Sequence, residues 1–192
     1  MKKLLFLLSM MASILSFAQT GSQKTALLVI DIQNFYFPGG ASELVNPIPA
    51  SLKAQKLLVH FREQKQLVIH VKHGDGLGAE IHTNVMPLPG EKVIVKNEVN
   101  SFLNTDLLEF FNNNGIKKLV ICGMQTNMCL EAATRAASDF GFGCTIIHDA
   151  CAAKNQVFNG RTVLAEDVHL AALATLEAYA KVISTEEYLG EK

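Results

Sequence analysis

The segment KLVICGMQTNMCLEAATRAASDFGFGCTIIHD (118–149) decides the fold, because it has the pattern of a strand, a helix and a second strand in succession. Nearly continuous apolar runs fill 118–123 and 144–149, as expected for strands covered on both faces. Between them, alanines recur at helical spacing from Asn127 to Phe140, and Gly141 ends the pattern. This succession predicts a right-handed crossover between two parallel strands.

The same alternation extends along the chain on both sides of this segment. Further short apolar runs rich in β-branched residues predict strands at 25–31, 66–71, 92–96 and 180–184. Helical patterns lie at Ser51–Gln64, Thr105–Asn113 and Ala165–Tyr179. Together they predict an α/β fold, with a three-layer, open, mainly parallel six-stranded sheet and helices on both faces, Rossmann-like in arrangement. Two loops, 74–90 and 154–163, are expected to wall a pocket.

Residues 1–18 have the features of a secretory signal peptide. Lys2 and Lys3 precede an apolar run that is too short for a stable membrane span, and small residues surround an expected cut after Ala18. We therefore expect export to the periplasm or the cell exterior, a single domain over 19–192, and no membrane contact after cleavage. A net charge of −1 without a basic stripe makes nucleic acid a poor candidate partner.

The four cysteines are close together in sequence, at Cys122, Cys129, Cys144 and Cys151. Export usually means an oxidising compartment, so pairing among Cys122, Cys144 and Cys151 stays an open alternative. The chain has enough apolar residues to fold without a disulfide scaffold. No Cys-x-x-Cys pair is present, which argues against a thiol redox protein.

Three polar residues stand at the ends of predicted strands, where ligands bind in an open parallel sheet. Asp31 follows the apolar run ALLVI, Lys96 ends the strand at 92–96, and Cys129 follows the strand at 118–123. Each has an ordinary structural interpretation: a turn-capping carboxylate, a solvated rim lysine, and a small residue packed on the buried face of its helix. An acid, an amine and a thiol at three different strand ends form a combination that chance produces less readily than any one member.

Cys129 also has a functional interpretation, because of its place in the chain. Thr126 or Asn127 is a candidate N-cap, which places Cys129 in the first turn of the helix. The unpaired N–H groups of that turn favour an anion, and a helix N-terminus lowers the pKa of a thiol. The same amides can hold a developing oxyanion. A nucleophilic Cys129 would use Asp31 as its base, with Lys96 stabilising both anions.

At these residues the chain resembles the isochorismatase-like cysteine hydrolase superfamily, over nearly the whole length from Thr25 to Leu189. The motifs that carry the resemblance are ALLVIDIQNFYF, KVIVKNEVNSF, VICGMQTNMCLEAATRAASDFGF and IIHDACAA, in the family's order and spacing. The resemblance implies that Asp31, Lys96 and Cys129 are the catalytic triad. It also implies a cis peptide at Met124–Gln125, with the Gln125 and Cys129 N–H groups as the oxyanion hole.

The resemblance further implies the reaction class. Members that hydrolyse isochorismate typically lack the cysteine, so its retention favours cleavage of a C–N bond in a small amide-like molecule, through an acyl-enzyme on Cys129. Nicotinamidase members carry a metal site after the second strand; here His70, His73, Asp75 and His82 do not reproduce its spacing. We therefore expect the non-metal branch, no cofactor, and a homo-oligomer.

Other residues have less specific interpretations. Phe37 and Phe102 lie close in sequence to Asp31 and Lys96; core packing is their default, and lining of the substrate pocket is the alternative. His60, His148 and His169 are expected to be packed or surface histidines. Two other functions stay open besides the amidohydrolase: a catalytically silent binding or scaffold protein of the same fold, and an isochorismatase- or nicotinamidase-type activity.

Overall fold

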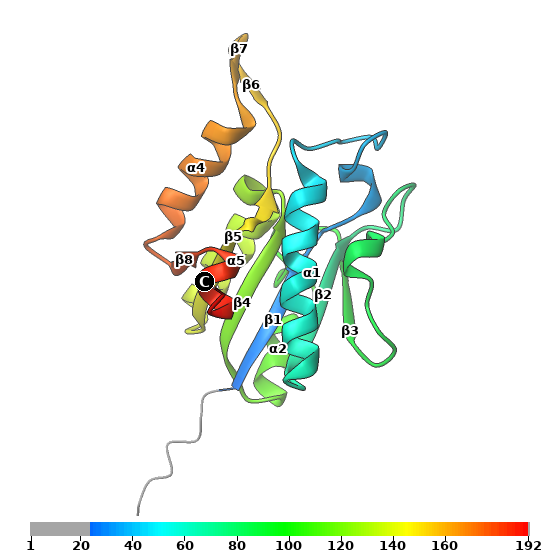
Figure 1. Cartoon of the computed structure of the whole chain (residues 1–192), viewed down its shortest axis with the longest axis vertical. Coiled ribbons are helices and arrows are strands. Elements are labelled where there is room, and N and C mark those ends of the chain that lie inside the picture. Colours follow the sequence, from blue (N-terminus) through cyan, green and yellow to red (C-terminus); the bar gives the residue numbers. More distant parts are fainter. Residues whose placement is uncertain (1–23, 192) are drawn as a thin grey trace, which may run out of the picture.

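The computed structural model describes residues 24–191 and contains one six-stranded parallel sheet with helices on both faces (Figure 1). The strand order is β3-β2-β1-β4-β5-β8. Every neighbouring pair in this sheet is parallel, which confirms the predicted α/β class. The predicted signal peptide, 1–18, lies outside the described residues. No helix within 24–191 has the length and apolarity needed to cross a membrane.

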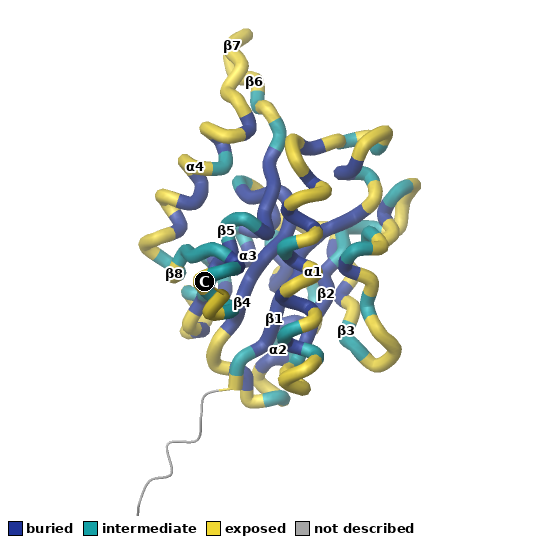
Figure 2. Tube along the Cα trace, in the orientation of Figure 1, coloured by how far each residue is buried: buried dark blue, intermediate teal, exposed yellow. Residues whose placement is uncertain are grey.

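The strands of the sheet follow the predicted runs closely. Their bounds are β1 (Lys24–Ile30), β2 (Leu67–His73), β3 (Lys92–Lys96), β4 (Ile116–Met124), β5 (Gly143–Ala152) and β8 (Ala180–Ile183). The central strands are the most deeply buried part of the chain (Figure 2). This is the physical reason for their unbroken apolar composition, because both faces of each strand are covered.

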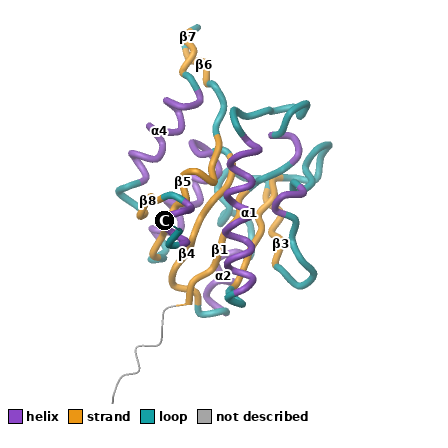
Figure 3. Tube along the Cα trace, viewed as in Figure 1, coloured by secondary structure: helices purple, strands orange, loops and turns teal. Residues whose placement is uncertain are grey.

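The helices divide into two layers, shown with the strands in Figure 3. One layer contains α1 (Pro47–Glu63) and α5 (Thr185–Leu189); the other contains α2 (Leu107–Asn113), α3 (Glu131–Asp139) and α4 (Ala165–Leu176). Alternate residues of β1 supply the two cores: Leu28 packs with the α2, α3 and α4 layer, and Leu27 packs with the α1 and α5 layer. Period-two alternation along each strand therefore produces the three-layer architecture.

Helix boundaries differ from the predictions where proline or capping residues act. The helix predicted to start at Ser51 begins at Pro47. Proline is favoured at the first position of a helix, because the N–H that it lacks would have no partner in the helix there. The helix predicted to end at Tyr179 ends at Leu176. Helix α5 was not predicted, although Ser184 and Glu187 form a capping box at its start.

The two predicted wall loops contain ordered structure. The segment 154–163 carries an antiparallel hairpin, β6 (Gln156–Phe158) and β7 (Arg161–Val163), which projects from the body (Figure 1). The segment 74–90 carries a 3-10 turn at Thr83–Val85, and Ile81 forms a bridge with Gln33. The sequence prediction missed the hairpin because its strands are only three residues long and mostly exposed, although Asn159 and Gly160 form a typical hairpin turn pair between them.

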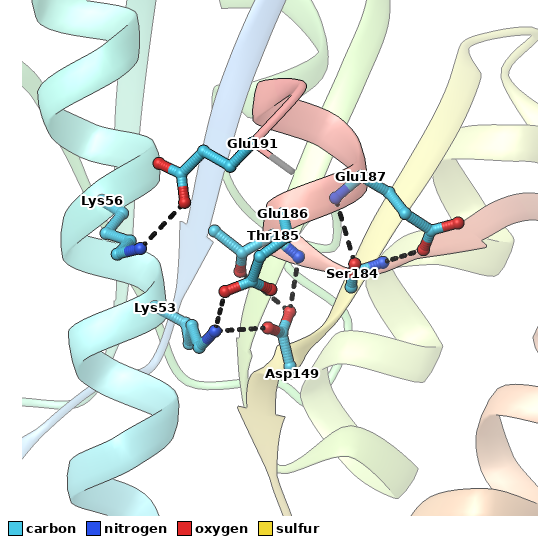
Figure 4. Close-up of polar contacts among 8 residues, drawn as sticks. All are labelled: Lys53, Lys56, Asp149, Ser184, Thr185, Glu186, Glu187 and Glu191. Carbon is cyan, nitrogen blue, oxygen red and sulfur yellow. Dashed lines mark hydrogen bonds and ion pairs between the residues drawn. The ribbon is translucent and has the colours of Figure 1, made fainter.

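The C-terminal helix is held against α1 and β5 by charged groups, drawn in Figure 4. Asp149 Oδ1 accepts hydrogen bonds of 2.8 Å from both the N–H and the hydroxyl of Thr185. Lys53 pairs with Asp149 at 3.3 Å and also with Glu186. These contacts fix α5 at the α1 face, on the side of the sheet opposite to α3.

The strand order creates a topological switch point between β1 and β4. The chain runs outward from β1 to β2 and β3, and it then returns to the other side of β1 to form β4. Ligands in open α/β sheets bind outside the carboxyl ends of the strands at such a point. Asp31 follows β1, and the loop that contains Cys129 follows β4, so both flank this crevice.

Candidate active site

The sheet topology brings the three predicted strand-end residues together. Asp31 follows β1, Lys96 is the last residue of β3, and Cys129 lies in the turn after β4. Strand β2 separates β3 from β1, so Lys96 must reach across it, a span of about 10 Å at the usual strand spacing. The long side chain of lysine covers that gap, and its head group arrives beside Asp31.

The Lys96 ammonium is the centre of the cluster. Its Nζ lies 2.7 Å from Asp31 Oδ2 and 3.4 Å from Cys129 Sγ, and it donates to the Glu98 carbonyl at 3.1 Å. The side chains of Asp31 and Lys96 are completely buried, and Cys129 is 5% exposed. An acid, an amine and a thiol therefore meet in a site that excludes most water.

Local backbone geometry sets the position of Asp31. Its φ is +52°, a left-handed conformation that aspartate tolerates better than most residues, and its N–H donates to the Val71 carbonyl at 2.9 Å. Gly123, at φ +141°, lies against the end of β1. A Cβ at Gly123 would stand 2.0 Å from the Ile30 oxygen, so only glycine lets β4 approach β1 this closely beside Asp31.

The turn that carries Cys129 differs from the predicted helix start. Residues Thr126–Leu130 form a π-helical turn, and α3 begins only at Glu131; no side chain caps the turn. The Gln125 carbonyl accepts from the N–H groups of both Met128 and Leu130. The peptide bond Met124–Gln125 is cis, as the family resemblance implied.

The expected lowering of the Cys129 pKa is wrong for this structure. Burial raises the pKa of the Cys129 thiol to about 12, the negative charge of Asp31 acts in the same direction, and Lys96 acts in the opposite direction. Burial also raises the pKa of Asp31, against the attraction of Lys96. Desolvation outweighs the helix terminus because the thiol is enclosed beside a carboxylate. The resting thiol is therefore protonated and needs a base.

Asp31 is placed to be that base. Among residues 24–191, its two oxygens have no hydrogen-bond partner beyond the Lys96 ammonium and the Cys129 thiol. A carboxylate without backbone donors keeps its lone pairs available for a proton.

Two residues that the sequence analysis did not place in the site contact its members. His73 ends β2, in register with Lys96, and its Nδ1 lies 3.2 Å from Lys96 Nζ. Tyr36 interacts through its hydroxyl with the Gln125 side chain, and its pKa is raised by burial and by the nearby Cys129 and Asp31. A signal for His73 was available: it is a polar residue at a strand end, like Lys96.

Two side-chain oxygens of the turn are buried and unsatisfied. Gln125 Oε1 and Asn127 Oδ1 have no hydrogen-bond partner within the described part of the chain. Buried acceptors of this kind usually find a donor, from the protein or from a bound molecule.

The four residues weighed as metal ligands do not converge. His70 Nε2 lies 3.0 Å from Glu91, Asp75 pairs with Lys72 at 2.6 Å, and His82 stacks on Phe37 with ring centroids 3.6 Å apart. In the range 24–191, the ligand atoms close enough to share an ion belong to Asp31, His73 and Cys129, within 4.8 Å of one another. Lys96 Nζ contacts all three of these residues, so an ammonium already stands where a cation would sit.

The aromatic pocket candidates are both buried. Phe37 belongs to the core on the α1 side, and Phe102 packs in an aromatic group with Phe111, Phe140 and Phe142. Phe102 shares its core cluster with Cys129. Their role in lining a substrate pocket stays a prediction.

All four cysteines are free and buried, so the alternative of a disulfide among Cys122, Cys144 and Cys151 is not realised. His169 was expected to be a packed or surface histidine. Its Nδ1 forms a hydrogen bond of 2.8 Å with the Thr126 hydroxyl. It lines a hollow of about 440 Å³ between the N-terminal ends of α1 and α4 and the end of β5. This hollow adjoins the turn that carries Cys129.

Comparison with known proteins found similar sequences and a matching family model. Residues 25–187 match the family model described as Isochorismatase domain. An uncharacterized isochorismatase family protein of Bacillus subtilis, YddQ, is 45% identical over 86% of this chain and 98% of its own length. Streptothricin hydrolase of Streptomyces noursei is 32% identical over 65% of this chain and 48% of its own length.

The fold has a close counterpart among solved structures. The crystal structure of a putative isochorismatase hydrolase from Oleispira antarctica is similar, with a TM-score of 0.85 and 43% identity. The similarity covers 89% of this chain and 98% of that one. The six-stranded sheet and its helices are therefore shared with that protein over nearly its whole length.

Proposed function

Because the chain belongs to the isochorismatase family and is a hydrolase of that family, we propose that it cleaves a C–N bond of a small amide-like molecule through an acyl-enzyme on Cys129. The observation that carries this proposal is the buried contact of one ammonium, Lys96, with both a carboxylate and a thiol. A carboxylate next to a protonated thiol supplies the base that a nucleophilic cysteine needs.

The first half of the reaction forms the acyl-enzyme. Asp31 takes the thiol proton, and the Cys129 sulfur attacks the carbonyl carbon of the substrate. The negative charge passes to the carbonyl oxygen, which the N–H groups of Gln125 and Cys129 hold as an oxyanion. The C–N bond then breaks, and the proton on Asp31 goes to the leaving nitrogen, which departs as ammonia or an amine.

The second half releases the acid. Asp31, again ionised, takes a proton from a water molecule, and the oxygen of that water attacks the thioester carbon. The C–S bond breaks, and the proton returns from Asp31 to the sulfur. Lys96 stabilises the carboxylate and the thiolate in turn, because its Nζ contacts both groups.

Several further observations support this proposal over the alternatives. A relative is named streptothricin hydrolase, so a hydrolase that acts on streptothricin is among the proteins similar to this chain. Isochorismate cleavage is disfavoured because Cys129 is retained and is contacted by Lys96. The free acceptors Gln125 Oε1 and Asn127 Oδ1 suit a substrate that carries N–H groups. We further propose that the protein acts outside the cytoplasm, on the basis of the signal-like segment 1–18, and that it forms a homo-oligomer, as the family resemblance implies.

The experiment is an ammonia-release screen of the purified protein across a panel of primary amides, ureides and carbamoyl compounds. Cys129→Ala should abolish release, and intact mass after substrate addition should show an acyl adduct on the wild-type chain alone. Cys144→Ala is the matched control, because Cys144 is also a buried free thiol but lies away from Lys96. Release that survives Cys129→Ala would overturn Cys129 as the nucleophile, and absence of release across the panel would favour a binding protein of the same fold.

A further inference from the structure

The structure points to a role for His73 that the three strand-end residues do not fill. His73 ends β2, its ring is half-buried, and its Nδ1 lies 3.2 Å from the Lys96 ammonium. Since a ring nitrogen of His73 falls within 4.8 Å of the reactive atoms of Asp31 and Cys129, the imidazole borders the place where a substrate reacts.

The contact with Lys96 determines which ring nitrogen carries the proton. A lysine ammonium has three N–H donors and no acceptor, so an atom that hydrogen-bonds to it must accept. A proton on Nδ1 would face the protons of the ammonium. The contact therefore assigns the role of acceptor to Nδ1 and the ring hydrogen to Nε2.

The backbone of His73 is held firmly in this position. Gln33 Oε1 accepts from the His73 N–H at 2.7 Å, and Gln33 Nε2 donates to the His73 carbonyl at 3.1 Å. The same Nε2 donates to the Ala79 carbonyl at 2.6 Å. Gln33 is completely buried, and it joins the end of β2 to the residues that follow Asp31. Gln33 thus fixes the backbone of His73, and the contact of Nδ1 with Lys96 orients the ring.

We propose that His73 is a substrate-positioning residue, which accepts from Lys96 at Nδ1 and donates its Nε2–H to an acceptor on the substrate. His73 is not the base that takes the Cys129 proton, which is the role that the histidine has in a cysteine–histidine pair. This inference rests on the proposed function, since it takes Cys129 as the reacting atom.

The position of the ring limits where that acceptor lies. When the substrate carbonyl carbon bonds to the Cys129 sulfur, the groups attached to that carbon lie next to the His73 ring. The acceptor is therefore on the atom next to the scissile carbonyl. The favoured substrates are amides with an oxygen or nitrogen acceptor at that position, such as 2-oxoamides, over plain alkyl amides.

The test measures how well two small amides protect Cys129 from alkylation by iodoacetamide at alkaline pH, with peptide mapping to locate the label. Methoxyacetamide and butanamide are the probes, because they have nearly the same size and differ in the acceptor on the carbon next to the amide carbon. We expect the wild-type chain to be protected by methoxyacetamide at about five- to tenfold lower concentration than by butanamide, the effect of one hydrogen bond.

Two variants separate the two ring nitrogens. In His73→Asn the side-chain oxygen can accept from Lys96 near the Nδ1 position, but no donor remains near Nε2. In His73→Gln a donor is kept near Nε2. We expect His73→Asn to be alkylated at the wild-type rate but to lose the preference for methoxyacetamide, and His73→Gln to keep much of that preference.

Each outcome decides between the interpretations. A wild-type chain without preference for methoxyacetamide, or a His73→Asn variant that keeps the preference, overturns the role of His73. Alkylation that becomes at least about tenfold slower in both variants, with unchanged thermal unfolding, makes His73 the base instead. A wild-type Cys129 that is not alkylated at all counts against the proposed function as well, so the two failures are distinct.

Discussion

Lys96 Nζ and Asp31 Oδ2 lie 2.7 Å apart, and both side chains are completely buried. A buried ion pair gives little net stability, because desolvation of both charges offsets their attraction. Its retention beside a thiol has a chemical explanation: the same ammonium contacts Cys129, and the same carboxylate is free to take a proton. The pair is therefore better explained by its chemistry than by its contribution to stability.

Removal of the Asp31 charge should separate thiol acidity from catalysis. In Asp31→Asn the negative charge that raises the Cys129 pKa is absent while the attraction of Lys96 remains, so the thiol pKa should fall from about 12. Turnover should nevertheless fall at least about 100-fold, because the base is lost. The pH dependence of Cys129 alkylation and the rate of ammonia release measure the two effects. Asp106→Asn, in an exposed pair with Lys92, should change neither. A thiol pKa that stays the same or rises would contradict the proposed electrostatics.

Loss of the ammonium should destabilise the fold. Lys96→Met leaves the carboxylate of Asp31 buried without its cation, and we expect the free energy of unfolding to fall by about 3–5 kcal/mol. The double variant Asp31→Asn/Lys96→Met removes the uncompensated charge and should recover a large part of that loss. Urea unfolding near neutral pH compares the variants. A double variant no more stable than Lys96→Met alone would show that the loss comes from packing.

Gly123 should not tolerate a side chain. Its φ is +141°, and a Cβ at this position would stand only 2.0 Å from the Ile30 oxygen, so Gly123→Ala forces β4 away from β1. We expect a loss of more than about 3 kcal/mol of stability, or failure to accumulate as soluble protein. Gly143→Ala is the control, since its Cβ would meet Lys118 at an ordinary distance of 3.6 Å. Thermal unfolding of the two variants decides; equal melting temperatures would refute the close approach.

The acid side of the stability curve should depend on Glu91. Burial opposes ionisation of this carboxyl, but hydrogen bonds from Arg62, the Leu88 N–H and His70 lower its pKa from 4.5 to about 2. A lowered pKa in the folded state gives stability that is present above pH 4.5 and is lost as the pH falls toward 2. In Glu91→Gln the free energy of unfolding should decline less steeply over that range. Arg62→Met should have a similar effect. An unchanged slope in both variants would assign the acid sensitivity to other groups.

Local patterns predicted most of the fold. The six strands of the sheet and the helices α1 to α4 were recognised from apolar periodicity, since burial on one face or on both faces imposes that periodicity on neighbouring residues. The hairpin β6–β7 was missed because its strands are only three residues long and mostly exposed, so no buried face constrains their composition. The short helix α5 is defined by its capping box and by contacts with Asp149, more than by an apolar stripe.

The sequence by itself determined the fold class and which acid, amine and thiol stand at strand ends, because both follow from residues close together in the chain. Only the tertiary structure decided how these residues act on one another. The Cys129 pKa was expected to be lowered, but it is raised because the thiol is buried and lies close to the negative charge of Asp31. His73 joins the site because β2 lies between β3 and β1, a pairing that depends on strand order and not on neighbouring residues.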